Sequence, residues 1–233
     1  MLHGSGSDAH FVRTAFARPL ARAGLRVVAP EDRSGDPDRM MRSLAGLTRR
    51  LPDVTVVGGV SIGAHAAARW AAQPGNQDAL TALILVMPAW TGQPAATSVL
   101  TQESAKTIRH EGVATQLLAM SMDESLKRDW VMEELTRAWP RQADTLAATL
   151  LRTSQSRGPL PAELARIRVP VAIVALADDP LHPASVAYEW SRIIPRAAVV
   201  EVPRHEPAKG RHVIGAAALT ALRKAQRRRE VLV

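Results

Sequence analysis

The stretch VVGGVSIGAHAAARW, residues 56–70, contains an apolar string, a serine between two glycines and an alanine-rich segment. The apolar residues at 54–60 predict a buried strand, and the alanines at 64–73 predict a helix. A strand that turns sharply into a helix strains the residue at the turn and needs neighbours without bulky side chains. Gly59 and Gly63 meet that need on either side of Ser61. The pattern predicts either a serine oxygen raised above a sheet beside a helix N-terminus, or a tight turn whose serine only caps the helix.

Four more apolar runs have the same strand-like character. They lie at residues 26–30, 80–88, 169–177 and 197–203. Their apolar residues are nearly continuous, which is typical of strands buried on both faces. Helical patterns alternate with them, at 8–24, 36–52, 64–73 and 183–194. Strands that alternate with helices predict an α/β fold with a mostly parallel sheet flanked by helices, whose functional residues lie at the carboxyl ends of the strands.

One long segment, from about 90 to 165, interrupts this alternation. It contains only helical patterns, which several prolines and Gly158 break up. We expect a helical lid at 90–165, inserted into a core made of residues 1–89 and 166–233.

Composition excludes several classes of protein. With 233 residues, 46% of them hydrophobic, the chain can bury a full core. The absence of cysteine excludes disulfides and thiolate chemistry and fits a reducing compartment, and no apolar run reaches the roughly 18 residues of a membrane helix. We therefore expect a cytoplasmic protein that does not bind membranes. The net charge of +8 is scattered apart from a basic run at 223–230, and one Tyr and two Phe offer little for base stacking, so we expect no nucleic-acid partner.

Polar residues follow the last two predicted strands. ADDPLHP, residues 177–183, ends the third of the four further runs, and Arg204 and His205 end the fourth. A nucleophilic serine needs a base and a carboxylate that orients the base. Ser61, Asp179 and His205 stand in the serine–acid–histidine order. Two rivals stay open: Asp178 as the acid, and His212 as the base.

The same turn offers a weaker metal interpretation. Asp178, Asp179 and His182 could resemble a metal-binding cluster, but no second histidine stands at a suitable spacing, which favours a turn-forming role. We expect no metal site and no cofactor. His65 either approaches the serine or packs in the core.

The chain resembles the α/β-hydrolases over nearly all of its length. HGSG (3–6) resembles the His-Gly oxyanion loop of that family, GVSIG (59–63) its nucleophile elbow, and ADDPLHP its acid turn, while 90–165 corresponds to its lid. The resemblance implies that Ser61 is the nucleophile.

The resemblance assigns further roles. It implies that His205 is the base, that Asp179 orients it, and that the backbone N–H groups of Ser5 and Ile62 form the oxyanion hole. His3 and Trp90 are candidates for substrate binding.

Two departures from the family pattern have physical consequences. Only Met1 and Leu2 precede His3, where the family has a complete strand and two more before it, so we expect either an N-terminally shortened fold or a true start upstream of Met1. An oxyanion loop anchored by a two-residue stub should be less rigid, which would weaken catalysis. The family often has glycine where Arg204 precedes His205.

The resemblance implies a serine hydrolase that cleaves an ester, lactone or thioester through an acyl-enzyme, with a small-molecule acyl substrate. The alternative is a non-hydrolytic protein of the same fold, either an acyltransferase or lyase, or a ligand-binding protein with weakened catalysis. The sequence indicates neither the substrate nor the oligomeric state.

Overall fold

The computed structural model of the protein describes residues 1–51, 53–124, 126 and 129–227. Residues 52, 125, 127, 128 and 228–233 are outside the described part. Two predictions reach into them: position 52 ends the helical pattern predicted at 36–52, and 228–233 include the end of the basic run.

Four parallel strands form the sheet, in the spatial order β1-β2-β3-β4. The strands are β1 (Val56–Val60), β2 (Ala82–Val86), β3 (Val171–Leu176) and β4 (Ala197–Val202). They fall within four of the five runs predicted from apolar continuity, so these four predictions are confirmed. All residues of β2 and β3 are buried, because helices cover the sheet on both faces.

The prediction of a strand at 26–30 is wrong. These residues have no strand pairing, and Val28 is 41% exposed. Their neighbour in space is the start of the chain: the Met1 amino group donates to the carbonyl of Val28 at 2.9 Å. Leu2 makes a single parallel bridge with Gly59 at the outer side of β1. A single hydrogen bond to Met1 is not a ladder, so 26–30 is irregular despite its apolar sequence.

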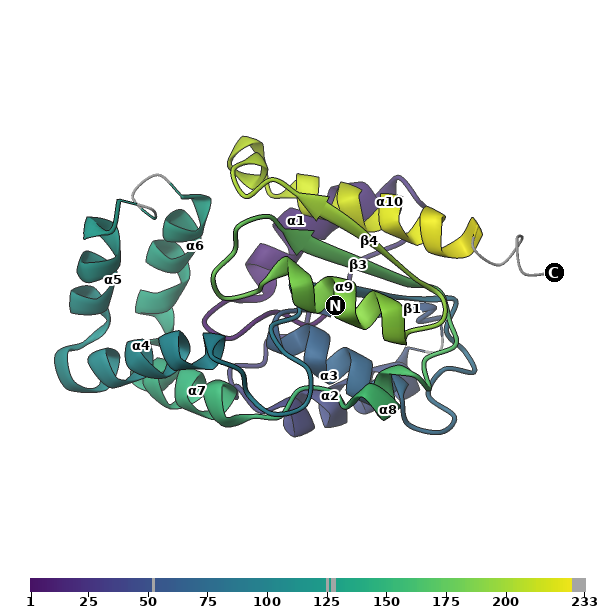
Figure 1. Cartoon of the computed structure of the whole chain (residues 1–233), viewed down its shortest axis with the longest axis horizontal. Coiled ribbons are helices and arrows are strands. Elements are labelled where there is room, and N and C mark those ends of the chain that lie inside the picture. Colours follow the sequence, from purple (N-terminus) through teal and green to yellow (C-terminus); the bar gives the residue numbers. More distant parts are fainter. Residues whose placement is uncertain (52, 125, 127–128, 228–233) are drawn as a thin grey trace.

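Helices cover the two faces of the sheet (Figure 1). On one face lie α1 (Ala9–Ala21) and α10 (His212–Arg227). On the other face lie α2 (Pro37–Arg50), α3 (Ile62–Ala71), α8 (Pro161–Leu164) and α9 (Ala184–Ile193). Alternate residues of β2 serve the two layers: Leu83 and Leu85 pack with α3, whereas Ile84 and Val86 pack with α1 and α10. The short 3₁₀ helix η2 (Glu206–Lys209) follows β4.

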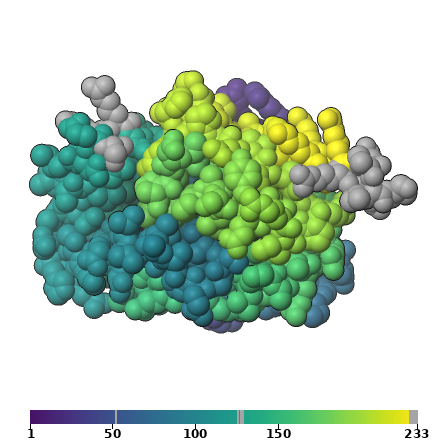
Figure 2. Space-filling view, in the orientation of Figure 1, coloured from purple at the N-terminus to yellow at the C-terminus, as the bar shows by residue number. Residues whose placement is uncertain are grey.

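A helical insert connects β2 to β3 and forms one end of the molecule (Figure 2). Its elements are α4 (Thr97–Glu111), α5 (Val113–Met122), α6 (Trp130–Ala138), the 3₁₀ helix η1 (Trp139–Gln142) and α7 (Ala143–Gln155). The insert has a small apolar core of its own, in which Ile108 of α4 packs with Leu146 and Leu150 of α7.

The two chain segments that join the insert to the sheet hydrogen-bond to each other. Gly158 donates to the carbonyl of Gly92 at 2.7 Å, and Gly92 donates to the carbonyl of Pro159 at 2.9 Å. These two hydrogen bonds hold the two ends of the insert together. No helix in the described part of the chain has both the length and the apolarity needed to span a bilayer.

Candidate active site

Ser61 lies at the turn between β1 and α3 in a strained backbone conformation. Its φ is 54° and its ψ is −120°, a region that L-residues rarely occupy. The serine side chain makes no capping hydrogen bond to α3, so the simple N-cap interpretation does not hold. Two backbone hydrogen bonds hold the turn: Ser61 donates to the carbonyl of Val86, and Ala64 donates to the carbonyl of Ser61.

The flanking glycines allow the strand, the helix and the first residues of the chain to approach one another. A Cβ on Gly59 would lie 2.1 Å from the carbonyl oxygen of Gly63, and a Cβ on Gly63 would lie 2.7 Å from the carbonyl oxygen of His3. Both contacts are to backbone atoms, which cannot move aside. These contacts explain why both positions are glycine, as the sequence pattern predicts.

The partner of the Ser61 side chain is His182. The Nε2 atom of His182 lies 2.9 Å from Ser61 Oγ, and Nδ1 lies 2.9 Å from Asp179 Oδ2. Because an ionised carboxylate can only accept, Nδ1 carries the hydrogen and donates it to Asp179, which leaves Nε2 free to accept from the Ser61 hydroxyl. Three side chains therefore form a continuous hydrogen-bonded chain from a carboxylate through an imidazole to a hydroxyl.

A tight turn after β3 brings the acid and the histidine together. Asp179 Oδ1 accepts hydrogen bonds from the backbone N–H groups of Leu181, at 2.9 Å, and His182, at 3.2 Å. This is a local side-chain-to-backbone turn, and it folds the histidine back over its own carboxylate. Asp178 precedes the turn with φ at 55°. Of the two aspartates, it is Asp179 that contacts a histidine.

The carboxyl of Asp179 is held in its ionised form. Burial opposes ionisation, but the charge and hydrogen bond of His182, the Leu181 N–H group and the charge of Arg204 outweigh it and hold the pKa of Asp179 well below its ordinary value. A carboxylate that stays ionised can orient a neutral imidazole and stabilise it once the imidazole is protonated.

The structure does not bring His205 to Ser61, so its assignment as the base is corrected. The His205 side chain is 74% exposed, and its Nε2 lies 3.4 Å from Glu206 Oε1. The reserve candidate, His212, is exposed at the start of α10. The histidine that contacts the serine stands only three residues after the acid, and the Asp-x-x-His spacing was the signal for it in the sequence.

The loop His3–Gly6 passes beside the serine. A Cβ on Gly4 would lie 3.2 Å from the Cβ of Ser61. The ring of His3 is 2% exposed; its Nδ1 lies 2.8 Å from the carbonyl of Gly4, and its Nε2 accepts from the N–H group of Asp32 at 2.9 Å. His3 therefore shapes the loop from within, and Ser5 follows Gly4 in it. Ile62, the first residue of α3, lies directly after the serine.

Several solved structures are similar to this chain over nearly its whole length. An esterase from Thermogutta terrifontis is 22% identical, with a TM-score of 0.69, over 99% of this chain and 87% of that one. A bromoperoxidase from Bacillus anthracis is 15% identical, with a TM-score of 0.76, over 96% and 90%. An enol-lactonase from Burkholderia xenovorans is 15% identical, with a TM-score of 0.72, over 97% and 90%. The chain has the α/β-hydrolase fold. No family model and no curated protein matches the sequence.

Within this α/β-hydrolase fold, the helical insert packs on the loop beside Ser61. A Cβ on Gly6, whose φ is +66°, would lie 2.6 Å from Nε1 of Trp139. Gln142 Nε2 donates to the carbonyl of Ser7 at 3.1 Å, and Arg137 binds both carboxylate oxygens of Asp8, at 2.6 and 2.8 Å. The loop expected to be loosely anchored by a two-residue stub is thus supported from its other side.

We expect the Asp8–Arg137 ion pair to make the free energy of unfolding decrease at acid pH. Burial opposes the ionised form of Asp8, but the Arg137 hydrogen bonds, the Phe11 N–H bond and the charge of Arg137 together outweigh it and lower the pKa of Asp8 from 3.8 to about 2. A lowered carboxyl pKa contributes stability that is present above pH 4 and is lost as pH falls towards 2. We expect Asp8→Asn to lower the unfolding free energy by about 2 kcal/mol at pH 7.

Urea unfolding of both proteins at pH 7, 4 and 2.5 measures this effect. Asn keeps a side-chain oxygen for the N-cap bond to Phe11, so the capping contribution remains. The difference between the two proteins should shrink steadily below pH 4, and a difference that stays constant across the three pH values would contradict the assignment.

The other predicted ligand contact, Trp90, lies at the base of the insert. It is 4% exposed, and its Nε1 donates to the carbonyl of Ser156 at 3.2 Å. The buried ring of His65 packs edge-on against the Trp90 ring, and His65 Nε2 accepts from the N–H group of Ala89 at 3.1 Å. Burial, and to a lesser extent the charges of His182 and Arg69, lowers the pKa of His65 to about 3, so His65 is a neutral core residue that packs beside the site.

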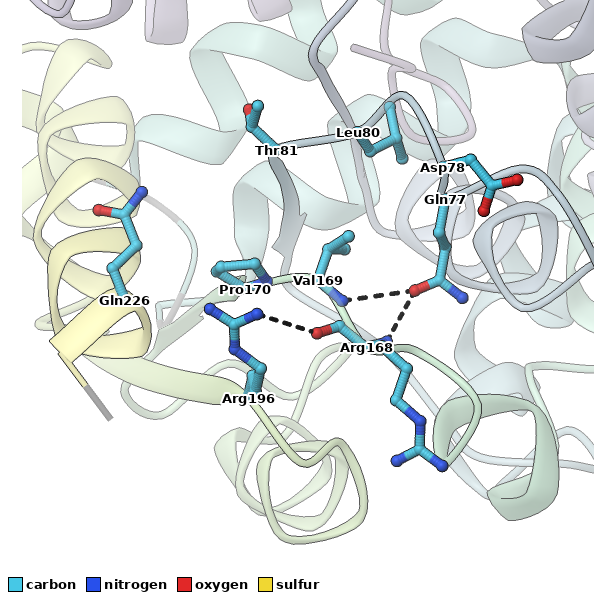
Figure 3. A pocket seen from close by; sticks show the side chains of 9 residues that line it. All are labelled: Gln77, Asp78, Leu80, Thr81, Arg168, Val169, Pro170, Arg196 and Gln226. Carbon is cyan, nitrogen blue, oxygen red and sulfur yellow. Dashed lines mark hydrogen bonds between the residues drawn. The ribbon is translucent and has the colours of Figure 1, made fainter. Parts of the chain in front are cut away.

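A surface hollow of about 720 Å³ lies away from this site (Figure 3). Residues before β2, β3 and β4 line it, so it opens at the amino ends of the strands, whereas Ser61 and His182 follow carboxyl ends. Part of its polar lining is paired within the hollow: Gln77 Oε1 accepts from the N–H group of Arg168, and Arg196 donates to the carbonyl of Arg168. Among the described residues, no three His, Asp or Glu side chains form a group able to hold a metal ion.

Proposed function

We propose that this protein is a serine hydrolase that cleaves an ester, lactone or thioester through an acyl-enzyme intermediate. Ser61 is the nucleophile, His182 the general base and acid, and Asp179 the orienting carboxylate. The observation that carries the proposal is the hydrogen-bonded chain from Asp179 through His182 to Ser61, with 2.9 Å at each link from the imidazole.

In the first half of the reaction, His182 Nε2 takes the proton of Ser61 as Oγ attacks the acyl carbon. The carbonyl oxygen becomes an oxyanion in the tetrahedral intermediate. The N–H groups of Ser5, in the loop beside the serine, and of Ile62 are its proposed donors. Ile62 is the first residue of α3, and the first N–H groups of a helix have no partner within the helix and lie at its positive end. His182 then gives its proton to the leaving alcohol or thiol, and Ser61 carries the acyl group.

In the second half, water attacks the acyl carbon while His182 takes one of its protons. Collapse of the second tetrahedral intermediate returns that proton to Ser61 Oγ and releases the carboxylic acid. Asp179 stays ionised throughout, which its lowered pKa supports. No cofactor is needed for these steps.

Two structural features support hydrolase chemistry over a site that only binds ligand. The strained φ of Ser61 presents its oxygen to the histidine rather than to the helix. The Trp139, Gln142 and Arg137 contacts fix the loop that carries Ser5. The similar solved structures include an esterase and an enol-lactonase, which agrees with acyl chemistry.

We also propose that the segment 90–165 acts as the lid of the site. The cytoplasmic location and the small-molecule acyl substrate remain predictions from the sequence.

A fluorophosphonate probe followed by peptide mass mapping tests the nucleophile. We expect stoichiometric labelling at Ser61, and hydrolysis of p-nitrophenyl acetate that stops when labelling is complete. Labelled protein without ester turnover would favour transfer to an acceptor other than water, such as in an acyltransferase. Folded protein that takes up no label would remove the acyl-enzyme mechanism and favour a ligand-binding role.

A further inference from the structure

Arg204, which departs from the family pattern, lies between two buried carboxylates. Its NH1 is 3.6 Å from Asp179 Oδ1, and its Nε makes an ion pair with Asp129 Oδ2. The side chains of Asp179 and Asp129 are 8% and 6% exposed, and that of Arg204 is 20% exposed. The guanidinium therefore connects the acid that faces His182 to a second carboxylate across the site.

Both ends of this connection are fixed by further hydrogen bonds. Asp129 caps α6, where its Oδ1 accepts from the N–H group of Val131 at 2.9 Å. Trp130 Nε1 donates to the carbonyl of Arg204 at 2.9 Å, and Arg204 NH1 donates to the carbonyl of Asp178 at 3.2 Å. The arginine is thus held by the helical insert and by the acid turn together.

Several groups of the described residues surround the imidazole or the carboxylate that binds it. His182 faces Ser61 and Asp179, and the nearby His65 is neutral. Asp179 faces Arg204 on its other side, and Arg204 faces Asp129. A positive charge on the His182 ring would be attracted by Asp179 and repelled by Arg204, and Asp129 neutralises part of the charge of Arg204. At distances of several ångströms in partly buried surroundings, such charges shift a proton equilibrium measurably.

We propose that Arg204 is a positioning residue that holds the Asp179 carboxylate against His182 and, together with Asp129 of the insert, sets the pH at which His182 becomes an active base. The inference rests on the proposed function for its kinetic readout. It gives the insert an electrostatic part in catalysis, through the path Asp129–Arg204–Asp179.

Two single variants test the proposal because they change the charge in opposite directions. Arg204→Gln removes a positive charge, so the acidic limb of the kcat/KM profile should move up by about half a pH unit. Asp129→Asn leaves Arg204 less neutralised, so the limb should move down by a similar amount. A merely structural role predicts no opposite pair of shifts. Arg204→Lys should restore the limb, with kcat reduced because a lysine lacks the planar fork that spans both carboxylates.

The matched control is Arg211→Gln. Arg211 also pairs with acidic residues of α6, Glu133 and Glu134, and stacks on Trp130, and these contacts do not involve the acid turn. Its loss should leave the limb in place. If the acidic limb of the kcat/KM profile lay at the same pH in wild type, Arg204→Gln and Asp129→Asn, the proposal would be overturned.

NMR titration of the His182 ring separates this inference from the proposed hydrolase function. The opposite shifts of the titration midpoint are expected in the two variants whether or not the protein turns over esters. Opposite midpoint shifts in a protein that shows no labelling at Ser61 would sink the hydrolase alone. Normal esterase activity with unchanged midpoints would sink the role of Arg204 alone.

Discussion

Replacement of His182 by alanine is expected to lower kcat/KM for an ester substrate by about 10⁴-fold or more. His182 is the group whose Nε2 contacts Ser61 Oγ, so its loss leaves the serine without a proton acceptor. Loss of one member of such a triad typically costs most of the rate enhancement, and the remainder comes from substrate binding and the oxyanion donors. Steady-state kinetics at pH 8 measures the loss, and circular dichroism checks that the variant is folded.

The matched control for this prediction is His205→Ala. His205 follows the last strand, where the order of residues in the sequence suggests a base, but its ring is exposed and contacts Glu206. We expect its removal to change kcat/KM by less than about twofold, as for other exposed residues outside a site. If His205→Ala lost activity and His182→Ala kept it, the proposed triad would be wrong.

Replacement of Gly59 by alanine is expected to have the largest effect on stability. Its Cβ would lie 2.1 Å from the carbonyl oxygen and 2.2 Å from the carbonyl carbon of Gly63, and 2.7 Å from the nitrogen of Ala64. These are backbone atoms in the first turn of α3, so the helix itself must shift. We expect a loss of about 4 kcal/mol, which corresponds to a fall in Tm of about 10 °C for a domain of this size.

Gly46→Ala is the control for the added methyl group. Gly46 lies inside α2, and a Cβ there meets nothing within 4 Å. Alanine in a helix interior is favoured over glycine by up to about 1 kcal/mol, so this variant should melt at the wild-type temperature or slightly above it. Thermal unfolding followed by circular dichroism compares the two. Equal melting temperatures for Gly59→Ala and wild type would show that the turn can accommodate a Cβ.

Local patterns in the sequence determined most of the elements and two of the three residues of the proposed triad, Ser61 and Asp179. Continuous apolar runs predicted the four strands of the sheet, because strands buried on both faces need no polar face. The glycines beside Ser61 predicted the strained turn, because only residues without a Cβ let β1 and α3 approach so closely. Asp179 was preferred as the acid, and it is the aspartate that contacts the candidate base. All of these follow from residues adjacent in the chain.

Only the tertiary structure decided which side chains meet across the chain. Whether 26–30 forms a strand depends on the backbone that it meets in space, which apolar content does not reveal. His182 is favoured over His205 because the turn after β3 folds back over Asp179, whereas β4 leads into η2 with its histidine facing solvent. Arg204 meets Asp129 across 75 positions of the chain. Chain order indicated that a serine, an acid and a histidine would gather at one edge of the sheet, but the choice of histidine depends on the direction of one turn, and that direction is set by packing and hydrogen bonds in three dimensions.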